Sequence, residues 1–160
     1  VALEPPGGAE VSRVVTGEEM FGEVDLRFPA CDILLMCAAV CDMKPRHTSA
    51  AKVKKQDLSS NIEFEPVVDI LKTVSLRKQP GQCLVGFAAE TDDVEAYARE
   101  KLATKRLDYI AANRVGGPDN AFEADRNEIL LMGRDGSRET IGPGPKLDIA
   151  RELLGHLHIG

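Results

Sequence analysis

The chain has 160 residues, of which 43% are hydrophobic and 29% are charged, and its formal net charge is -6 at pH 7. This size and composition indicate one globular domain that can bury a core, and the acidic total argues against a nucleic-acid partner. No apolar stretch approaches the ~18 residues that a membrane span needs and no signal peptide is evident, so we expect a cytoplasmic protein with no membrane partner.

The first half of the chain alternates between extended and helical patterns. Residues 11–15 predict a strand, and Thr16 can cap a helix over residues 17–26. The apolar run at 31–37 predicts a strand that is covered on both faces, as in the middle of a parallel sheet. An extended excursion is expected near residues 43–65, followed by a helix over 68–76.

The second half repeats the alternation and ends in a hairpin. A buried strand at 84–88 precedes a helix that Asp92 or Asp93 opens, with an apolar face of Val94, Tyr97, Ala98 and Leu102. A further strand is predicted at 109–112, then a loop at 116–118, a hairpin of 129–132 with 139–141, a rigid linker at 142–146 and a helix at 147–157. This order predicts a Rossmann-like α/β fold with a mostly parallel sheet flanked by helices and a C-terminal antiparallel hairpin.

Residues that could bind an anion follow the strand at 31–37. Ligands of parallel sheets bind at the carboxyl ends of strands, and there Ala38 and Ala39 would allow close approach to the backbone. Asp42 is a possible acceptor for hydroxyls or magnesium, and Lys52 begins a run of three lysines within four residues, which favours a phosphate ligand. The alternative is that these lysines belong to a solvated edge strand, where they deter aggregation.

Other common sites are not indicated. Neither GxGxxG nor GxxxxGK follows a strand, so a dehydrogenase or P-loop protein is a poor interpretation. The cysteines and histidines lack the spacing of metal ligands, and we expect Cys31, Cys37, Cys41 and Cys83 to be free, buried thiols, with Cys41 beside the proposed pocket.

Four motifs in order carry a resemblance to a known family. They are Met-Cys-Ala-Ala-Val-Cys-Asp at 36–42, Lys-Val-Lys-Lys at 52–55, Val-Gly-Phe-Ala-Ala-Glu-Thr at 85–91 and Leu-Asp-Tyr-Ile-Ala-Ala-Asn at 107–113. Together they resemble phosphopantothenoylcysteine synthetase, the ligase domain that many bacteria fuse behind a flavin decarboxylase. The resemblance implies that residues 1–160 form a single nucleotide-binding ligase domain that lacks the family's opening strand and glycine-rich turn. Because that segment is linked to the acyl-nucleotide step, this piece alone is expected to be limited in activity.

The resemblance also implies a reaction and its participants. The expected activity is CTP-dependent ligation of 4'-phosphopantothenate with L-cysteine through an acyl-cytidylate, a step of coenzyme A biosynthesis. Mg²⁺ would accompany CTP, FMN would be present only if a decarboxylase half precedes the domain, and a homodimer is expected. The alternative is a noncatalytic module on the same fold that binds nucleotide or forms a dimer through the extended excursion.

Site residues are carried over only where the motifs match. Lys52 is the expected catalytic residue, and no metal ligands are assigned. Each of these assignments has a plainer alternative. Lys52 could be a solvated strand lysine, and Phe87 could pack in the core. Lys101 and Lys105, spaced i, i+4, could lie on a solvated helix face. Val67-Val68 stands where the family commonly has Asn-Pro, which leaves the choice between CTP and ATP open. The expected nucleotide-binding residues are Ala38, Ala39, Asp42, Lys52, Val68, Asp69, Ile70, Phe87, Lys101 and Lys105.

Overall fold

The computed structural model describes residues 4–49, 51–55, 61–90, 93–114 and 125–157. Its helices are α1 (Gly17–Arg27), the 3-10 turn η1 (Phe28–Ala30), α2 (Ile70–Ser75), α3 (Val94–Thr104) and α4 (Lys146–His156). Its strands are β1 (Ile33–Met36), β2 (Met43–Pro45), β3 (Phe64–Pro66), β4 (Cys83–Glu90), β5 (Tyr109–Arg114), β6 (Arg126–Gly133) and β7 (Arg138–Pro145).

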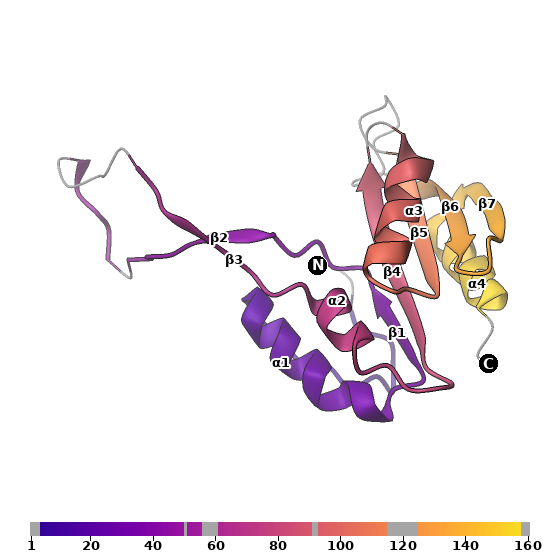
Figure 1. The fold of residues 1–160 in the computed structure, drawn as a ribbon, viewed down its shortest axis with the longest axis horizontal. Helices are drawn as coiled ribbons and strands as arrows, with labels where there is room; N and C mark the ends of the chain where they lie inside the picture. The colour runs from indigo at the N-terminus through magenta and orange to yellow at the C-terminus, as the bar shows by residue number, and fades with distance from the viewer. Residues whose placement is uncertain (1–3, 50, 56–60, 91–92, 115–124, 158–160) are drawn as a thin grey trace.

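A five-stranded sheet in the order β1-β4-β5-β6-β7 forms the centre of the fold (Figure 1). The β1–β4 and β4–β5 pairs are parallel, and the β5–β6 and β6–β7 pairs are antiparallel. The predicted Rossmann-like α/β fold with its C-terminal hairpin is therefore confirmed, although parallel and antiparallel pairs are equal in number.

Helices cover both faces of this sheet, as the side-chain alternation of β4 requires. On one face Leu84 and Ala88 pack in a cluster with Val74 of α2 and Ala98 of α3. On the other face Val85 packs with a second cluster that includes Ile149 and Leu153 of α4. The predicted apolar face of α3 is confirmed at Ala98 and at the partly buried Val94 and Leu102, whereas Tyr97 is exposed.

The cap predicted at Thr16 is confirmed, and α2 has a cap at Asp69 that was not predicted from the sequence. The Thr16 side chain accepts a hydrogen bond from Glu19 N, and Glu19 in turn accepts from Thr16 N, which completes a capping box. Asp69 caps α2 by accepting from Lys72 N at 3.0 Å. At α3, Asp93 occupies the N-cap position without a side-chain bond, and Asp92 lies outside the described residues.

The predicted strand at residues 11–15 was wrong. The segment has no regular structure, Val15 is 94% exposed, and its N–H donates to Glu19 Oε2 instead of to a neighbouring strand. The expectation that residues 31–37 are covered on both faces was also wrong, because β1 is the edge of the sheet within the described residues and Leu35 is exposed.

Three smaller expectations have mixed outcomes. Residues 142–145 extend β7 and Lys146 already begins α4, so they are not a linker. All four cysteines are free, but only Cys83 is buried, while Cys37 and Cys41 are exposed. The predicted loop at 116–118 lies outside the described residues.

The excursion near residues 43–65 is confirmed as an extension of the domain. Strands β2 and β3 pair antiparallel and project away from the central sheet (Figure 1). The base is anchored by Val67 N donating to Asp42 O at 2.8 Å and by an ion pair between Lys44 and Glu18 of α1. None of the described helices has the length and apolar character that crossing a bilayer requires.

Candidate functional site

The carboxyl end of β1 leaves part of β4 without a neighbour on that side. Met36, the last residue of β1, pairs with Gly86, whereas β4 continues to Glu90. Among the described residues, the β1 side of Phe87–Glu90 therefore has no strand partner, and the chain turns away from the sheet at Ala38. This is the edge at which ligands of parallel α/β sheets bind.

A cavity of about 420 Å³ lies beside this end of β1. Both predicted alanines, Ala38 and Ala39, line it together with Cys41. The start of α1 forms an opposing wall, where Gly17 allows close packing because a Cβ there would lie 2.9 Å from Val67 Cγ1. The remaining lining residues are Val14, Val15, Thr16, Glu18, Met20, Val40, Lys44, Pro45, Thr48 and Val67.

The two predicted helix lysines each contact a carboxylate. Lys101 Nζ lies 2.6 Å from Oε1 of Glu90, and Lys105 Nζ lies 3.0 Å from Oδ2 of Asp69. Because Asp69 Oδ1 already caps α2, this one side chain connects α2 with the end of α3. Lys101 is thus paired at the carboxyl end of β4 and Lys105 at the start of α2, while their nucleotide-binding role stays a prediction.

The other predicted nucleotide-binding residues have more varied surroundings. Phe87 is partly buried against the cluster on the α4 face, so the core-packing alternative describes its side chain, and it lies on the opposite face of β4 from Ala88. Ile70 is buried at 3% exposure, and Val68 is partly buried. Asp42 is exposed, and its carbonyl holds the base of the extension.

Lys52 is separated from these residues within one chain. It is exposed and belongs to the extension, which carries it away from the central sheet (Figure 1). The structure thus places Ala38 and Ala39 on one cavity and pairs Asp69 with Lys105, but it does not bring Lys52 to either of them.

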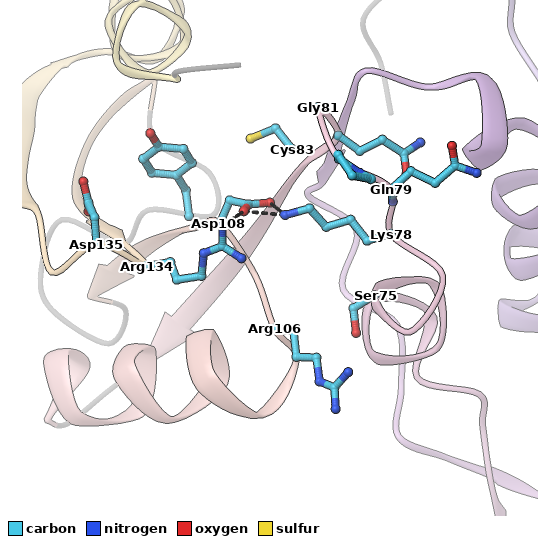
Figure 2. A pocket seen from close by; sticks show the side chains of 12 residues that line it. Ser75, Lys78, Gln79, Gly81, Cys83, Arg106, Asp108, Arg134 and Asp135 are labelled. Atoms are coloured by element: carbon cyan, nitrogen blue, oxygen red, sulfur yellow. Dashed lines mark hydrogen bonds and ion pairs between the residues drawn. The ribbon is translucent and has the colours of Figure 1, made fainter. Parts of the chain in front are cut away.

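A larger cavity of about 540 Å³ lies at the opposite, amino end of the strands, and Figure 2 shows its side chains. Asp108 is central to it: the carboxylate pairs with Lys78 and Arg134 and accepts from Leu84 N at 2.8 Å. Its acceptor capacity is thus used by the protein itself. This arrangement joins three segments of the fold and favours a structural role over a ligand site.

A metal site built by the protein is not found in the part of the chain that the structure describes, since no three His, Cys, Asp or Glu side chains there are grouped to hold an ion.

Glu90 belongs to the candidate site through its contact with Lys101, but it was assigned no role from the sequence. Its position two residues after the buried strand predicted at 84–88 was the available signal, because such a carboxylate reaches the carboxyl edge of the sheet.

A family model matches this architecture over nearly all of the chain. The model is that of the DNA/pantothenate metabolism flavoprotein C-terminal domain, and it matches residues 1–159. The chain is also 41% identical over 155 residues to the coenzyme A biosynthesis bifunctional protein CoaBC of Bacillus subtilis. That alignment covers 96% of this chain and 38% of the Bacillus protein, so the chain spans well under half of that relative.

Solved structures agree with the family match. The crystal structure of the C-terminal domain of a CoaBC protein superimposes with a TM-score of 0.77 at 32% identity, covering 96% of this chain and 67% of that one. A Cab2 H337A mutant in complex with phosphopantothenate-cysteine has a TM-score of 0.59 at 14% identity, covering 89% and 53% of the two chains, which shows a shared fold.

Proposed function

Because the chain belongs to the family of the DNA/pantothenate metabolism flavoprotein C-terminal domain, we propose that it is a ligase domain that joins 4'-phosphopantothenate to L-cysteine with CTP. The product is 4'-phosphopantothenoyl-L-cysteine. The coenzyme A biosynthesis named for the Bacillus relative and the phosphopantothenate-cysteine bound to Cab2 support this choice of substrates.

The observation that carries the proposal is the position of Lys101 and Lys105. Lys101 contacts Glu90 at the carboxyl end of β4, and Lys105 contacts Asp69 at the start of α2. Asp69 follows Val67 by two residues, and Val67 lines the cavity that Ala38 and Ala39 also line. A triphosphate that binds there would meet two cations from one helix face. The small alanines would admit the nucleoside close to the backbone, and backbone groups from Val68 to Ile70 would contact the base.

The chemistry proceeds in two steps. A carboxylate oxygen of 4'-phosphopantothenate attacks the α-phosphate of CTP, and the bond to the β-phosphate breaks, which releases pyrophosphate and leaves an acyl-cytidylate. The amine of cysteine then attacks the acyl carbon, CMP leaves, and the amine loses its proton as the amide forms. Both steps concentrate negative charge, so positioned lysines contribute by electrostatic stabilisation more than by proton transfer.

Magnesium and flavin stand outside these steps. The described residues offer no metal site of their own, so Mg²⁺ would arrive on the phosphates of CTP and no step is assigned to it. FMN would be held by a decarboxylase half where one precedes the domain, and the ligation does not use it.

Lys52 enters the proposal through a second copy of the chain. Its extension leads away from the central sheet (Figure 1) and carries four exposed apolar side chains, Met43, Val53, Ile62 and Phe64. Pairing of two extensions would bury these side chains and would direct Lys52 toward the partner's site. The proposed assembly is therefore a homodimer in which Lys52 neutralises charge during acyl transfer.

Turnover tests the proposal directly. The chain is incubated with CTP, Mg²⁺, 4'-phosphopantothenate and cysteine, and the acyl-cytidylate, CMP and the amide are followed by mass spectrometry. Because this chain lacks the family's opening segment, we expect only a low level of acyl-cytidylate, its loss in Lys105→Gln, and less product with ATP. Nucleotide binding without any acyl-cytidylate would instead support the noncatalytic module.

Complementation tests the position of Lys52. Lys52→Ala and Lys105→Gln are each expected to be inactive, whereas a mixture of the two chains would regain about a quarter of wild-type activity, because half of the dimers are mixed and each mixed dimer has one intact site. Failure of the mixture to regain activity while mixed dimers form would show that Lys52 serves its own chain.

A further inference from the structure

The two side chains of the Lys101–Glu90 ion pair differ in solvent exposure, and this difference bears on ligand exchange. The Glu90 side chain is 17% exposed, whereas that of Lys101 is 41% exposed, and the Nζ–Oε1 distance is 2.6 Å. Glu90 is the last residue of β4, within a strand that pairs with β5, so its backbone is fixed. Lys101 is therefore the partner that can turn toward a ligand while the carboxylate stays in place.

Resting on the proposed function, we infer that Glu90 is a competing counterion that recaptures Lys101 and thereby promotes release of pyrophosphate. An anion that binds Lys101 must share or replace the Glu90 carboxylate, and the fixed negative charge next to it weakens the complex. When the bond between the α- and β-phosphates of CTP breaks, the pyrophosphate is free to leave, and Glu90 provides an alternative partner for the ammonium. Glu90 is a positioning residue in this scheme, since it acts through Lys101.

Asp69 shows why Glu90 is the better residue for a test. Asp69 contacts Lys105 in the same way, but its other oxygen caps α2, so that changing it also affects the helix. The Glu90 side chain contacts Lys101 and has no such second bond to another of the described residues. Glu95 on α3 is a matched control, because it pairs with Arg99 and Arg138 and not with Lys101.

The experiment is calorimetric titration with pyrophosphate and with CTP of the wild-type chain, Glu90→Gln, Lys101→Gln, the double variant and Glu95→Gln. Glu90→Gln is expected to bind pyrophosphate about three- to tenfold more tightly, as expected for removal of a nearby like charge in a partly exposed site. The gain should vanish in the Lys101→Gln background, and Glu95→Gln should match the wild type. In turnover, Glu90→Gln should show stronger inhibition by pyrophosphate, a lower KM for CTP and a lower kcat.

Weaker or unchanged pyrophosphate binding by Glu90→Gln, with an unchanged melting temperature, would overturn the inference and leave the proposed function standing, provided that Lys101→Gln still weakens CTP binding. If Lys101→Gln leaves CTP binding intact, both the inference and the role of Lys101 fail. If the wild-type chain binds neither ligand, the nucleotide site itself is refuted.

Discussion

Asp108 shows how one carboxylate can organise three distant parts of a chain. It pairs with Lys78 after α2 and with Arg134 after β6 (Figure 2), and it also accepts from Leu84 N at the start of β4. The side chains of Asp108 and Lys78 are 14% and 16% exposed, so each charge is stabilised mainly by its partner and little by solvent.

Replacing Asp108 by Asn removes one charge from this cluster and leaves Lys78 partly buried without its counterion. We expect the free energy of unfolding to fall by about 2 to 4 kcal/mol, as for other broken buried pairs. Urea denaturation measures the loss. Arg134→Gln is the control: its side chain is 68% exposed, so it should lose under about 1 kcal/mol. Equal losses in the two variants would contradict the account of the cluster.

Cys41 offers a chemical test of the cavity beside β1. Its thiol is exposed and lines that cavity, so iodoacetamide should modify it readily in the free protein and several-fold more slowly when CTP is bound. Cys83 is the internal reference, because burial raises the pKa of its thiol and keeps the reactive thiolate scarce at neutral pH. Peptide mass spectrometry after timed alkylation gives both rates. If saturating CTP does not slow the alkylation of Cys41, the cavity beside β1 is not part of the nucleotide site.

At the scale of elements, two glycines make opposite predictions about packing. A Cβ at Gly86 in β4 would lie 2.6 Å from Cδ1 of the buried Leu107, whereas one at Gly155 in α4 has nothing within 4 Å. Gly86→Ala should therefore cost about 1 to 3 kcal/mol through overpacking, and Gly155→Ala should stabilise by about 0.5 to 1 kcal/mol through helix propensity. Thermal and urea unfolding of the two variants would test how tightly β4 packs against Leu107. A neutral Gly86→Ala would mean that the layer is looser than described.

Helices and central strands were predictable because their signals are local. Thr16 with Glu19, and Asp69 with the N–H of Lys72, are caps that a few neighbouring residues determine. The strand expected at 11–15 failed because a strand needs a partner, and that backbone is engaged in capping α1. The role of Glu90 was missed for a similar reason: its pairing with Lys101 depends on how α3 packs on β4, and the sequence does not state that distance.

At the scale of the whole molecule, the extension formed by β2 and β3 contributes no residue to either core cluster of the central sheet. Replacing residues 47–62 by Asn-Gly would join Arg46 to Glu63, whose backbones already share a hydrogen bond of 2.9 Å, by a short hairpin turn. We expect the melting temperature to change little, because both core clusters lie outside the extension. If the proposed homodimer forms through the extension, light scattering should report a dimer for the full chain and a monomer for the shortened chain. A dimer that persists in the shortened chain would place the interface elsewhere.

The carboxyl edge of the sheet, with Lys105 at its side, is the proposed binding site for CTP. Calorimetric titration of the chain with CTP and Mg²⁺, repeated with ATP and with Lys105→Gln, tests it most directly. We expect saturable CTP binding, weaker binding of ATP and a loss of at least about tenfold in affinity in Lys105→Gln, since a lost charged contact to phosphate is worth about 1.5 to 3 kcal/mol. Saturable CTP binding that Lys105→Gln leaves unchanged would contradict it.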